Sequence, residues 1–164
     1  MAIIVYSVGD DISTDVIYPG RFMATVLPTE TPQFAFADDK EFNARLKARQ
    51  VPPGSILFGG QNFGCGSSRE QAVSCLKGHP LTIVARSFAR IFLQNAINLG
   101  LDVVTCPTLA AQIGDELEFK ATAVINRTSG KKFPTVPLPQ SRQAIIDAGG
   151  LIAFTRQRLV ATSR

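Results

Sequence analysis

Residues 55–77 read SILFGGQNFGCGSSREQAVSCLK, and this stretch decides the fold class. Ser55–Phe58 is a short apolar run, which predicts a buried strand. Residues 59–68 are rich in glycine and predict a tight loop, and a helix is predicted to follow over Arg69–Lys77, with Glu70 or Gln71 in its first turn. Ser67 or Ser68 is expected to cap that helix, because a hydroxyl just before the first turn can accept a backbone hydrogen bond.

The flanking sequence repeats this order of strand and helix. Strands are predicted over Ala2–Val8, Thr82–Ala85 and Val103–Cys106, and helices over Asp38–Arg49, Phe88–Leu99 and Arg142–Ala148. Residues 11–22 are expected to form an ordered loop, and residues 116–139 a strand, a turn and a proline-rich edge. Strands that alternate with helices predict an α/β fold with a mixed, partly parallel sheet flanked by helices, as a single domain over residues 1–164.

The helix predicted over Phe88–Leu99 carries two specific expectations. Ser87 precedes it and is expected to be its N-cap. Phe88, Ile91 and Phe92 recur at helical spacing and are expected to lie in the core.

Composition excludes several classes of protein. The chain is 45% hydrophobic and 18% charged, so it is not disordered. Its net charge of +4 is too small to predict nucleic-acid binding, and the basic residues after Lys131 are expected to lie on a solvated surface. The apolar start ends at Gly9, which is too short for a membrane span or a signal peptide, so the cytoplasm is the expected compartment.

The metal-ligating residues are few. Cys65, Cys75 and Cys106 are odd in number and have no CxxC spacing, and His79 is the only histidine. This set predicts neither a disulfide framework nor a closed metal site within the chain. The cysteines are expected to be packing residues.

The loop at 62–70 contains the residues best suited to binding or catalysis. Backbone N–H groups at a helix start, two serine hydroxyls and Arg69 can bind a carboxylate or stabilise a serine alkoxide. A simple helix cap is an equally good interpretation of the pattern. No Lys follows the last glycine, so the loop is not a Walker phosphate loop, and it does not match G-x-S-x-G. His79 lies at the far end of the helix, too far to form a triad with Ser67. Ser67 therefore has no base beside it, and this chain is expected to hold half of an active site.

Three stretches together carry a family resemblance. They are NFGCGSSRE at 62–70, GDDISTDVIYPGR at 9–21 and ARSFARIFLQNAINLG at 85–100. In order and spacing they resemble the swivel domain of the aconitase superfamily, in the branch of isopropylmalate dehydratase small subunits. Gln71 departs from the pattern, which usually has His there.

The resemblance implies roles for five residues. Ser67 is the base that removes the substrate's proton, and Asp15 orients groups near the substrate hydroxyl. Ser68 and Arg69 match positions that bind a substrate carboxylate or stabilise the oxyanion. Arg21 matches an arginine that pairs with a carboxylate through both nitrogens of its fork.

The resemblance also implies a partner and a reaction. A separate large subunit would carry a 4Fe-4S cluster as the Lewis acid, forming a heterodimer or heterotetramer with this chain. The reaction would be reversible loss and re-addition of water on a small hydroxy acid.

The segment after Arg21 bears on the substrate. Phe22, Met23, Ala24 and Thr25 match the family's specificity segment and include no second arginine, which favours 2-isopropylmalate and leucine biosynthesis over homoaconitase chemistry. Citramalate, dimethylmalate and a non-catalytic anion-binding role are the alternatives.

Overall fold

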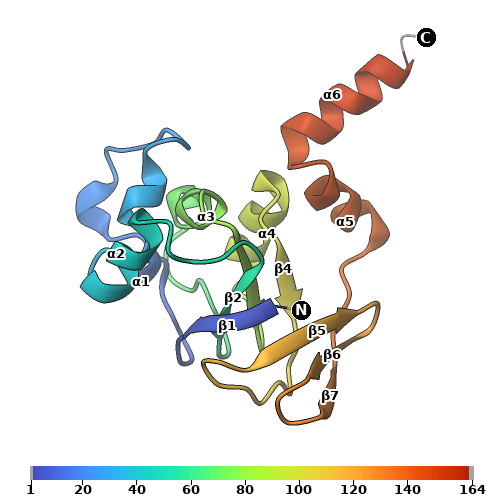
Figure 1. Cartoon of the computed structure of the whole chain (residues 1–164). Coiled ribbons are helices and arrows are strands. Elements are labelled where there is room, and N and C mark those ends of the chain that lie inside the picture. The colour runs from blue at the N-terminus through green and yellow to red at the C-terminus, as the bar shows by residue number, and fades with distance from the viewer. Residues whose placement is uncertain (1, 163–164) are drawn as a thin grey trace.

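The computed structural model describes residues 2–162 and joins seven strands in one mixed sheet, in the order β4-β3-β2-β1-β5-β6-β7 (Figure 1). The strands are β1 (Ala2–Ser7), β2 (Ser55–Gly59), β3 (Leu81–Ala85), β4 (Val103–Thr105), β5 (Glu116–Lys120), β6 (Ala123–Asn126) and β7 (Lys131–Pro134). The helices are α1 (Thr14–Ile17), α2 (Lys40–Lys47), α3 (Glu70–Lys77), α4 (Arg90–Leu99), α5 (Gln140–Asp147) and α6 (Leu151–Thr162), with 3-10 turns at Gly20–Phe22 and Thr31–Phe34.

One half of the sheet is parallel and the other half is antiparallel. β1 to β4 pair in parallel, in a register that sets Ile4 opposite Ile56 and Ile56 opposite Thr82. β5 pairs antiparallel with β1, and β6 and β7 continue as an antiparallel meander. Each parallel pair is joined through helices, as such a crossover requires. The predicted α/β class and the mixed, partly parallel sheet are confirmed.

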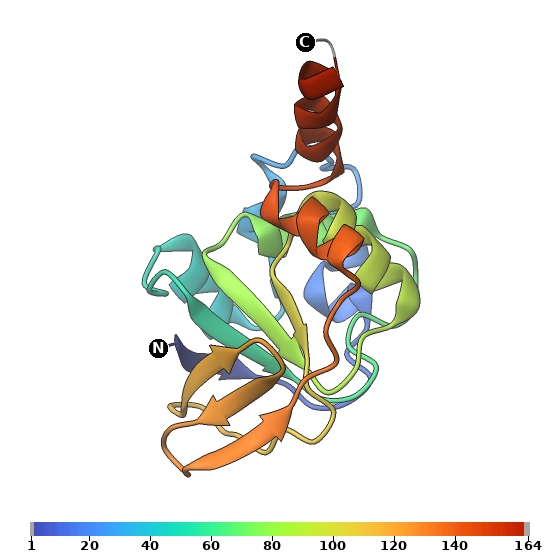
Figure 2. The ribbon, with the colours of Figure 1, turned by 90° about the vertical axis from the view of Figure 1, so that its right-hand side faces the viewer.

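Each face of the parallel strands has its own core. Leu57, Ile83 and Ala85 point to one face, where α1, α2, α3 and α4 each contribute buried side chains. Ile56 and Val84 alternate to the other face and pack with Leu117, Val124 and Cys106 from the antiparallel half and its connections. The strands β5 to β7 therefore cover the face that the helices leave open, as the turned view shows (Figure 2).

The C-terminal helix α6 extends away from the rest of the structure (Figures 1 and 2). The sequence predicts a solvated surface for this basic segment, and its pattern gave no sign of the helix. None of its described residues is buried, and Ile152 is 72% exposed. No helix within residues 2–162 has the length and apolar character needed to cross a bilayer.

Both predicted serine caps are wrong. The N-cap of α3 is Arg69, and that of α4 is Ala89; neither makes a side-chain cap hydrogen bond. The Ser87 hydroxyl instead accepts a hydrogen bond from the backbone N–H of Asn62 at 2.8 Å. The Ser67 and Ser87 hydroxyls make contacts with another loop, and a local sequence pattern cannot reveal such long-range contacts.

Other local expectations had mixed outcomes. Phe92 is buried and Phe88 packs against the same core, but Ile91 is wrong as a core residue because it is 45% exposed. Residues 11–22, expected as a loop, contain α1 and a 3-10 turn. Cys75 and Cys106 are buried as expected.

Replacing Gly64 with alanine should destabilise the fold. Gly64 has φ +82°, and a Cβ there would meet the Phe92 ring at 2.2 Å. Gly114 is the matched control, because it has φ +92° and nothing within 4 Å of such a Cβ. Urea unfolding should show Gly64→Ala costing about 1–3 kcal/mol more than Gly114→Ala, the range for overpacking a core. Equal losses in the two variants would mean that the contact with Phe92 is not limiting.

Candidate functional site

The site begins where two loops run side by side. One follows β1 and the other follows β2, and the two strands are parallel neighbours, so their carboxyl ends lie at the same edge of the sheet. The N–H of Gly64 donates to the carbonyl of Ile12 at 2.7 Å, and the N–H of Thr14 donates to the carbonyl of Cys65 at 2.8 Å. This backbone bridge brings the residues after Ile12 against the residues after Cys65.

Ser67 lies at the end of that bridge. Its Oγ is 3.2 Å from the Oγ1 of Thr14, and the Thr14 hydroxyl also lies 3.1 Å from the Ser67 carbonyl oxygen, to which it can donate. Thr14 is only 2% exposed, whereas Ser67 and Ser68 are both exposed. The Ser67 hydroxyl is thus fixed from the protein side and open on the other.

Asp15 and Arg69 form the charged part of the site. The Arg69 guanidinium makes an ion pair with the Asp15 carboxylate and also donates to the carbonyl of Tyr18 at 3.3 Å. The backbone N–H of Gly20 donates to the same carboxylate at 2.8 Å. The hydrogen bond from Arg69, followed by that from Gly20, holds the pKa of Asp15 below its usual value. Asp15 is therefore an ionised partner that keeps the guanidinium beside the serine loop.

The Arg21 guanidinium binds the carboxylate of Asp38 through both of its terminal nitrogens. Its Nη2 and Nη1 lie 2.5 Å and 3.3 Å from the two oxygens of Asp38, and its guanidinium lies over the Phe22 ring at 4.6 Å. Arg21 hydrogen-bonds Asp38, and this lowers the pKa of that carboxyl. Because both partners are exposed, the pair adds little to stability, but its geometry is the one that Arg uses for any carboxylate.

The four residues of the segment 22–25 differ in how far they are exposed. Phe22 stacks on Phe34 with the ring centroids 4.2 Å apart. The buried Tyr18 hydroxyl donates to the carbonyls of Phe22 and Thr25. Met23 is 36% exposed, and Ala24 is exposed. Of the four predicted specificity residues, Met23 and Ala24 are thus the more exposed, and Phe22 and Thr25 are half-buried.

Sequence reasoning missed three contributors to this site. Thr14 contacts Ser67, and its position beside Asp15 in the motif was a usable signal. Gly20 supplies a backbone N–H, and a Cβ there would approach the Asp15 carboxylate to 3.2 Å and Arg69 to 3.3 Å. Asp38 lies 17 residues from Arg21, and no spacing rule connects them.

Within residues 2–162 no group of three His, Cys, Asp or Glu side chains is placed to hold a metal ion. Cys65 is half-buried, and its thiol donates to the carbonyl of Asp11 at 3.3 Å. The part of the chain that the structure describes therefore offers no set of ligands that fits an iron–sulfur cluster.

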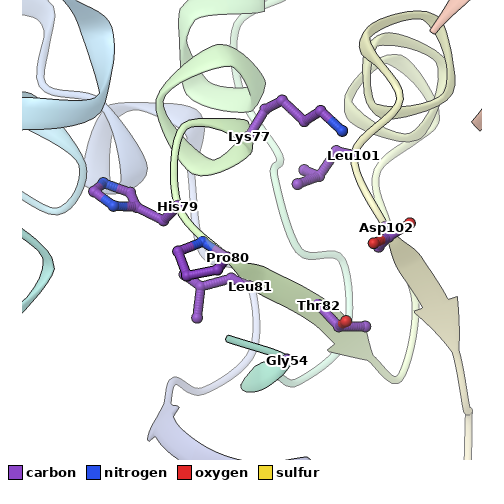
Figure 3. A pocket seen from close by; sticks show the side chains of 8 residues that line it. All are labelled: Gly54, Lys77, His79, Pro80, Leu81, Thr82, Leu101 and Asp102. Atoms are coloured by element: carbon purple, nitrogen blue, oxygen red, sulfur yellow. The ribbon is translucent and has the colours of Figure 1, made fainter. Parts of the chain in front are cut away.

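A hollow of about 250 Å³ lies at the opposite, amino edge of the parallel strands (Figure 3). Lys77 and His79 line it but point in different directions. The Lys77 ammonium donates to the carbonyl of Gly100, and His79 Nε2 lies 2.9 Å from the carbonyl of Pro32. Burial lowers the pKa of His79, so the ring favours its neutral form. Both side chains are thus engaged with backbone carbonyls. We therefore place the candidate site at the serine loop.

The Asp15–Arg69 pair should make part of the stability depend on pH. The pKa of Asp15 is lowered in the folded state, so its contribution is present above the unfolded value of about 3.9 and is lost as the pH falls through the folded value. Urea unfolding should show that wild type is more stable than Asp15→Asn at pH 7, with the difference shrinking below about pH 4.

Arg69→Gln, alone and with Asp15→Asn, completes a double-mutant cycle for this pair. The pH-dependent difference should be smaller in the Arg69→Gln background, where the Gly20 N–H still lowers the pKa of Asp15. A difference between wild type and Asp15→Asn that stays constant from pH 7 to pH 3 would contradict the assignment.

Comparisons with known proteins place this geometry in context. Residues 12–108 match the family described as the aconitase C-terminal domain. The 3-isopropylmalate dehydratase small subunit of Thermodesulfovibrio yellowstonii is 41% identical, with 94% of this chain and 93% of that protein covered. The isopropylmalate/citramalate isomerase small subunit of Methanocaldococcus jannaschii is 38% identical, over 94% and 93%.

A solved structure agrees with these relatives. The crystal structure of a 3-isopropylmalate dehydratase from Methanocaldococcus jannaschii has a TM-score of 0.87 and 33% identity, and the match covers 98% of this chain and 96% of that one. The likeness therefore extends beyond the serine loop to nearly the whole fold.

Proposed function

The chain belongs to the aconitase C-terminal domain family, and from that premise we propose that it is the small subunit of a 3-isopropylmalate dehydratase. Together with its large subunit it interconverts 2-isopropylmalate and 3-isopropylmalate in leucine biosynthesis, by loss and re-addition of water. The names of the relatives support this assignment over most of the chain's length. The observation that carries it is that Ser67, Arg69, Asp15 and Arg21 gather at one edge of the sheet.

The four residues suit the two demands of the reaction. A proton bound to carbon next to a carboxylate must be removed, and we assign this to the Ser67 oxygen, which returns the proton during hydration. Arg69 lies at the start of α3, close behind Ser67, where its positive charge favours an anionic serine oxygen or substrate. Asp15 fixes the orientation of Arg69 through their ion pair. Ser68 is exposed beside Ser67 and is assigned to a substrate carboxylate.

Arg21 is assigned to a second carboxylate. Its fork already holds the two oxygens of Asp38, and a substrate carboxylate presents the same two oxygens. Binding would exchange one carboxylate for another at the same guanidinium. This exchange costs little, because the Arg21–Asp38 pair is exposed.

The exposure of the site supports a partner subunit. Ser67, Ser68 and Arg21 lie on the open surface, and a reaction of this kind needs a site that is closed to bulk solvent. We place the 4Fe-4S cluster on a separate large subunit that covers this edge, since the described residues of this chain offer no ligand set. When bound there, the cluster would supply a Lewis acid for the substrate hydroxyl.

Substrate choice is assigned to Met23 and Ala24. Their apolar side chains are available near Arg21, which suits an alkyl group beside a carboxylate. Citramalate is the second candidate substrate, because one relative is named an isopropylmalate/citramalate isomerase small subunit. An apolar pocket discriminates alkyl groups that differ by one or two methylenes only modestly.

Two wider features complete the proposal. The cores on both faces of one sheet support a single swivel domain over residues 1–164. Cys65, Cys75 and Cys106 are all free thiols, which supports a reducing compartment such as the cytoplasm.

Ser67→Ala should abolish turnover in the reconstituted enzyme. The chain would be combined anaerobically with its large subunit, and hydration of 2-isopropylmaleate assayed beside citraconate and dimethylmaleate. Loss of the base should lower kcat by at least about a thousandfold, since residues that act directly on the reacting atoms carry effects of that size. Ser141→Ala, on the exposed face of α5, is the control and should be fully active. Full activity in Ser67→Ala would overturn the assignment of the base, and turnover of another acid alone would change the substrate.

Arg21→Lys should separate binding from chemistry. Lysine keeps the charge but loses the fork, so KM for 2-isopropylmaleate should rise about tenfold or more, as expected for losing one charge-assisted contact. The apparent kcat should change by less than about threefold, because substrate and transition state share this carboxylate contact. Arg142→Lys, which is exposed on α5, is the matched control. An unchanged KM would remove Arg21 from the binding site.

A further inference from the structure

We propose that Thr14 is a positioning residue for the reaction, whose hydroxyl holds the Ser67 oxygen in place and donates a hydrogen bond to it when it is anionic. The inference rests on the proposed function of Ser67 as the base. The distances that carry it are 3.2 Å between the two hydroxyl oxygens and 3.1 Å between Thr14 Oγ1 and the Ser67 carbonyl oxygen. One hydroxyl thus reaches both polar atoms of the serine that can accept a hydrogen bond.

Thr14 is held firmly enough to act in this way. Its backbone N–H donates to Cys65, and its carbonyl accepts from the N–H of Tyr18 at 2.9 Å. Its side chain is 2% exposed, and β-branching restricts it to few rotamers. On the other side of the contact, Gly66 has φ +91°, and a Cβ there would already lie 3.6 Å from Thr14 Oγ1. Ser67 therefore lies against an oxygen, Thr14 Oγ1, whose position is fixed by the fold.

The single hydroxyl proton of Thr14 has two possible acceptors. While Ser67 is neutral, its own O–H can donate to Thr14 Oγ1, and Thr14 then donates to the Ser67 carbonyl. Once Ser67 carries a negative charge it has no proton to donate, and rotation of the Thr14 hydroxyl turns that O–H toward Ser67 Oγ. No proton changes owner in this rotation. The anion gains a charge-assisted hydrogen bond from a buried, preorganised donor, the kind of contact that favours the charged state.

This role also accounts for both halves of the Thr14–Asp15 pair in the sequence motif. Thr14 holds Ser67, and Asp15 holds Arg69. Adjacent side chains of α1 thus fix two functional residues of the serine loop. A purely structural brace would use only the Ser67 carbonyl, so the two readings predict different kinetics.

The test compares Thr14→Val, Thr14→Ser and Ser67→Ala, each reconstituted with the large subunit and assayed on 2-isopropylmaleate. Thr14→Val keeps the shape and removes the hydroxyl. Its kcat should fall about tenfold to a hundredfold, with KM within about twofold, as for a lost preorganised donor. Thr14→Ser should keep kcat within about threefold, because the hydroxyl remains. Thermal unfolding and association with the large subunit are measured for every variant, and Thr14→Ala beside Thr14→Ser isolates the hydroxyl if valine does not fit.

The outcomes separate this inference from the proposed function. Full kcat in Thr14→Val, with Ser67→Ala inactive, would overturn the role of Thr14 and leave the base assignment intact. Equal losses in Thr14→Ser and Thr14→Ala would assign the effect to the methyl group and also overturn it. Activity in Ser67→Ala would overturn the base assignment, and with it this inference.

Discussion

The backbone bridge between residues 12–14 and residues 64–65 is the constraint on which the site depends. It joins loops that are about fifty residues apart in sequence through hydrogen bonds that involve no side chain. Gly64 permits it, because a larger residue at this positive φ would run into the Phe92 ring of α4. The position of Ser67 is thus tied to the packing of α4 on the sheet, so the core and the site are not independent.

Charge at the site is arranged by local carboxylates. Arg69 and Arg21 are each paired with an aspartate, and both aspartates have lowered pKa values because of those arginines. The pairs differ in what they do. Arg69 is half-buried and also bonded to the Tyr18 carbonyl, which suits a guanidinium with a fixed place, whereas Arg21 and Asp38 are both exposed and can exchange partners. A fixed cation beside the serine and an exchangeable one beside the apolar residues Met23 and Ala24 form a surface that fits a small alkyl-substituted acid.

The parallel and antiparallel halves of the sheet have different structural roles. The parallel half collects the loops of the site at its carboxyl edge, as open α/β sheets do. The antiparallel half covers the second face of the parallel strands with Leu117 and Val124, which leaves the helices on the face nearer to the serine loop. The helix α6 takes no part in either core. Its apolar residues lie all round the helix, so no single stripe directs it onto the sheet.

The sequence by itself determined the features that depend on neighbouring residues. The apolar runs at 55–58 and 82–85 and the helical spacing in α2 and α4 were sufficient for the α/β class, because periodicity records which face an element buries. It also identified Ser67, Arg69, Asp15 and Arg21 as candidates, since they lie within short motifs. Only the tertiary structure decided what these side chains contact. In the fold, Thr14 contacts Ser67, and Asp38 pairs with Arg21. The Ser87 hydroxyl accepts a hydrogen bond from another loop, and Ile91 faces solvent. Such contacts join residues that only the folded chain brings together, and no local pattern contains that information.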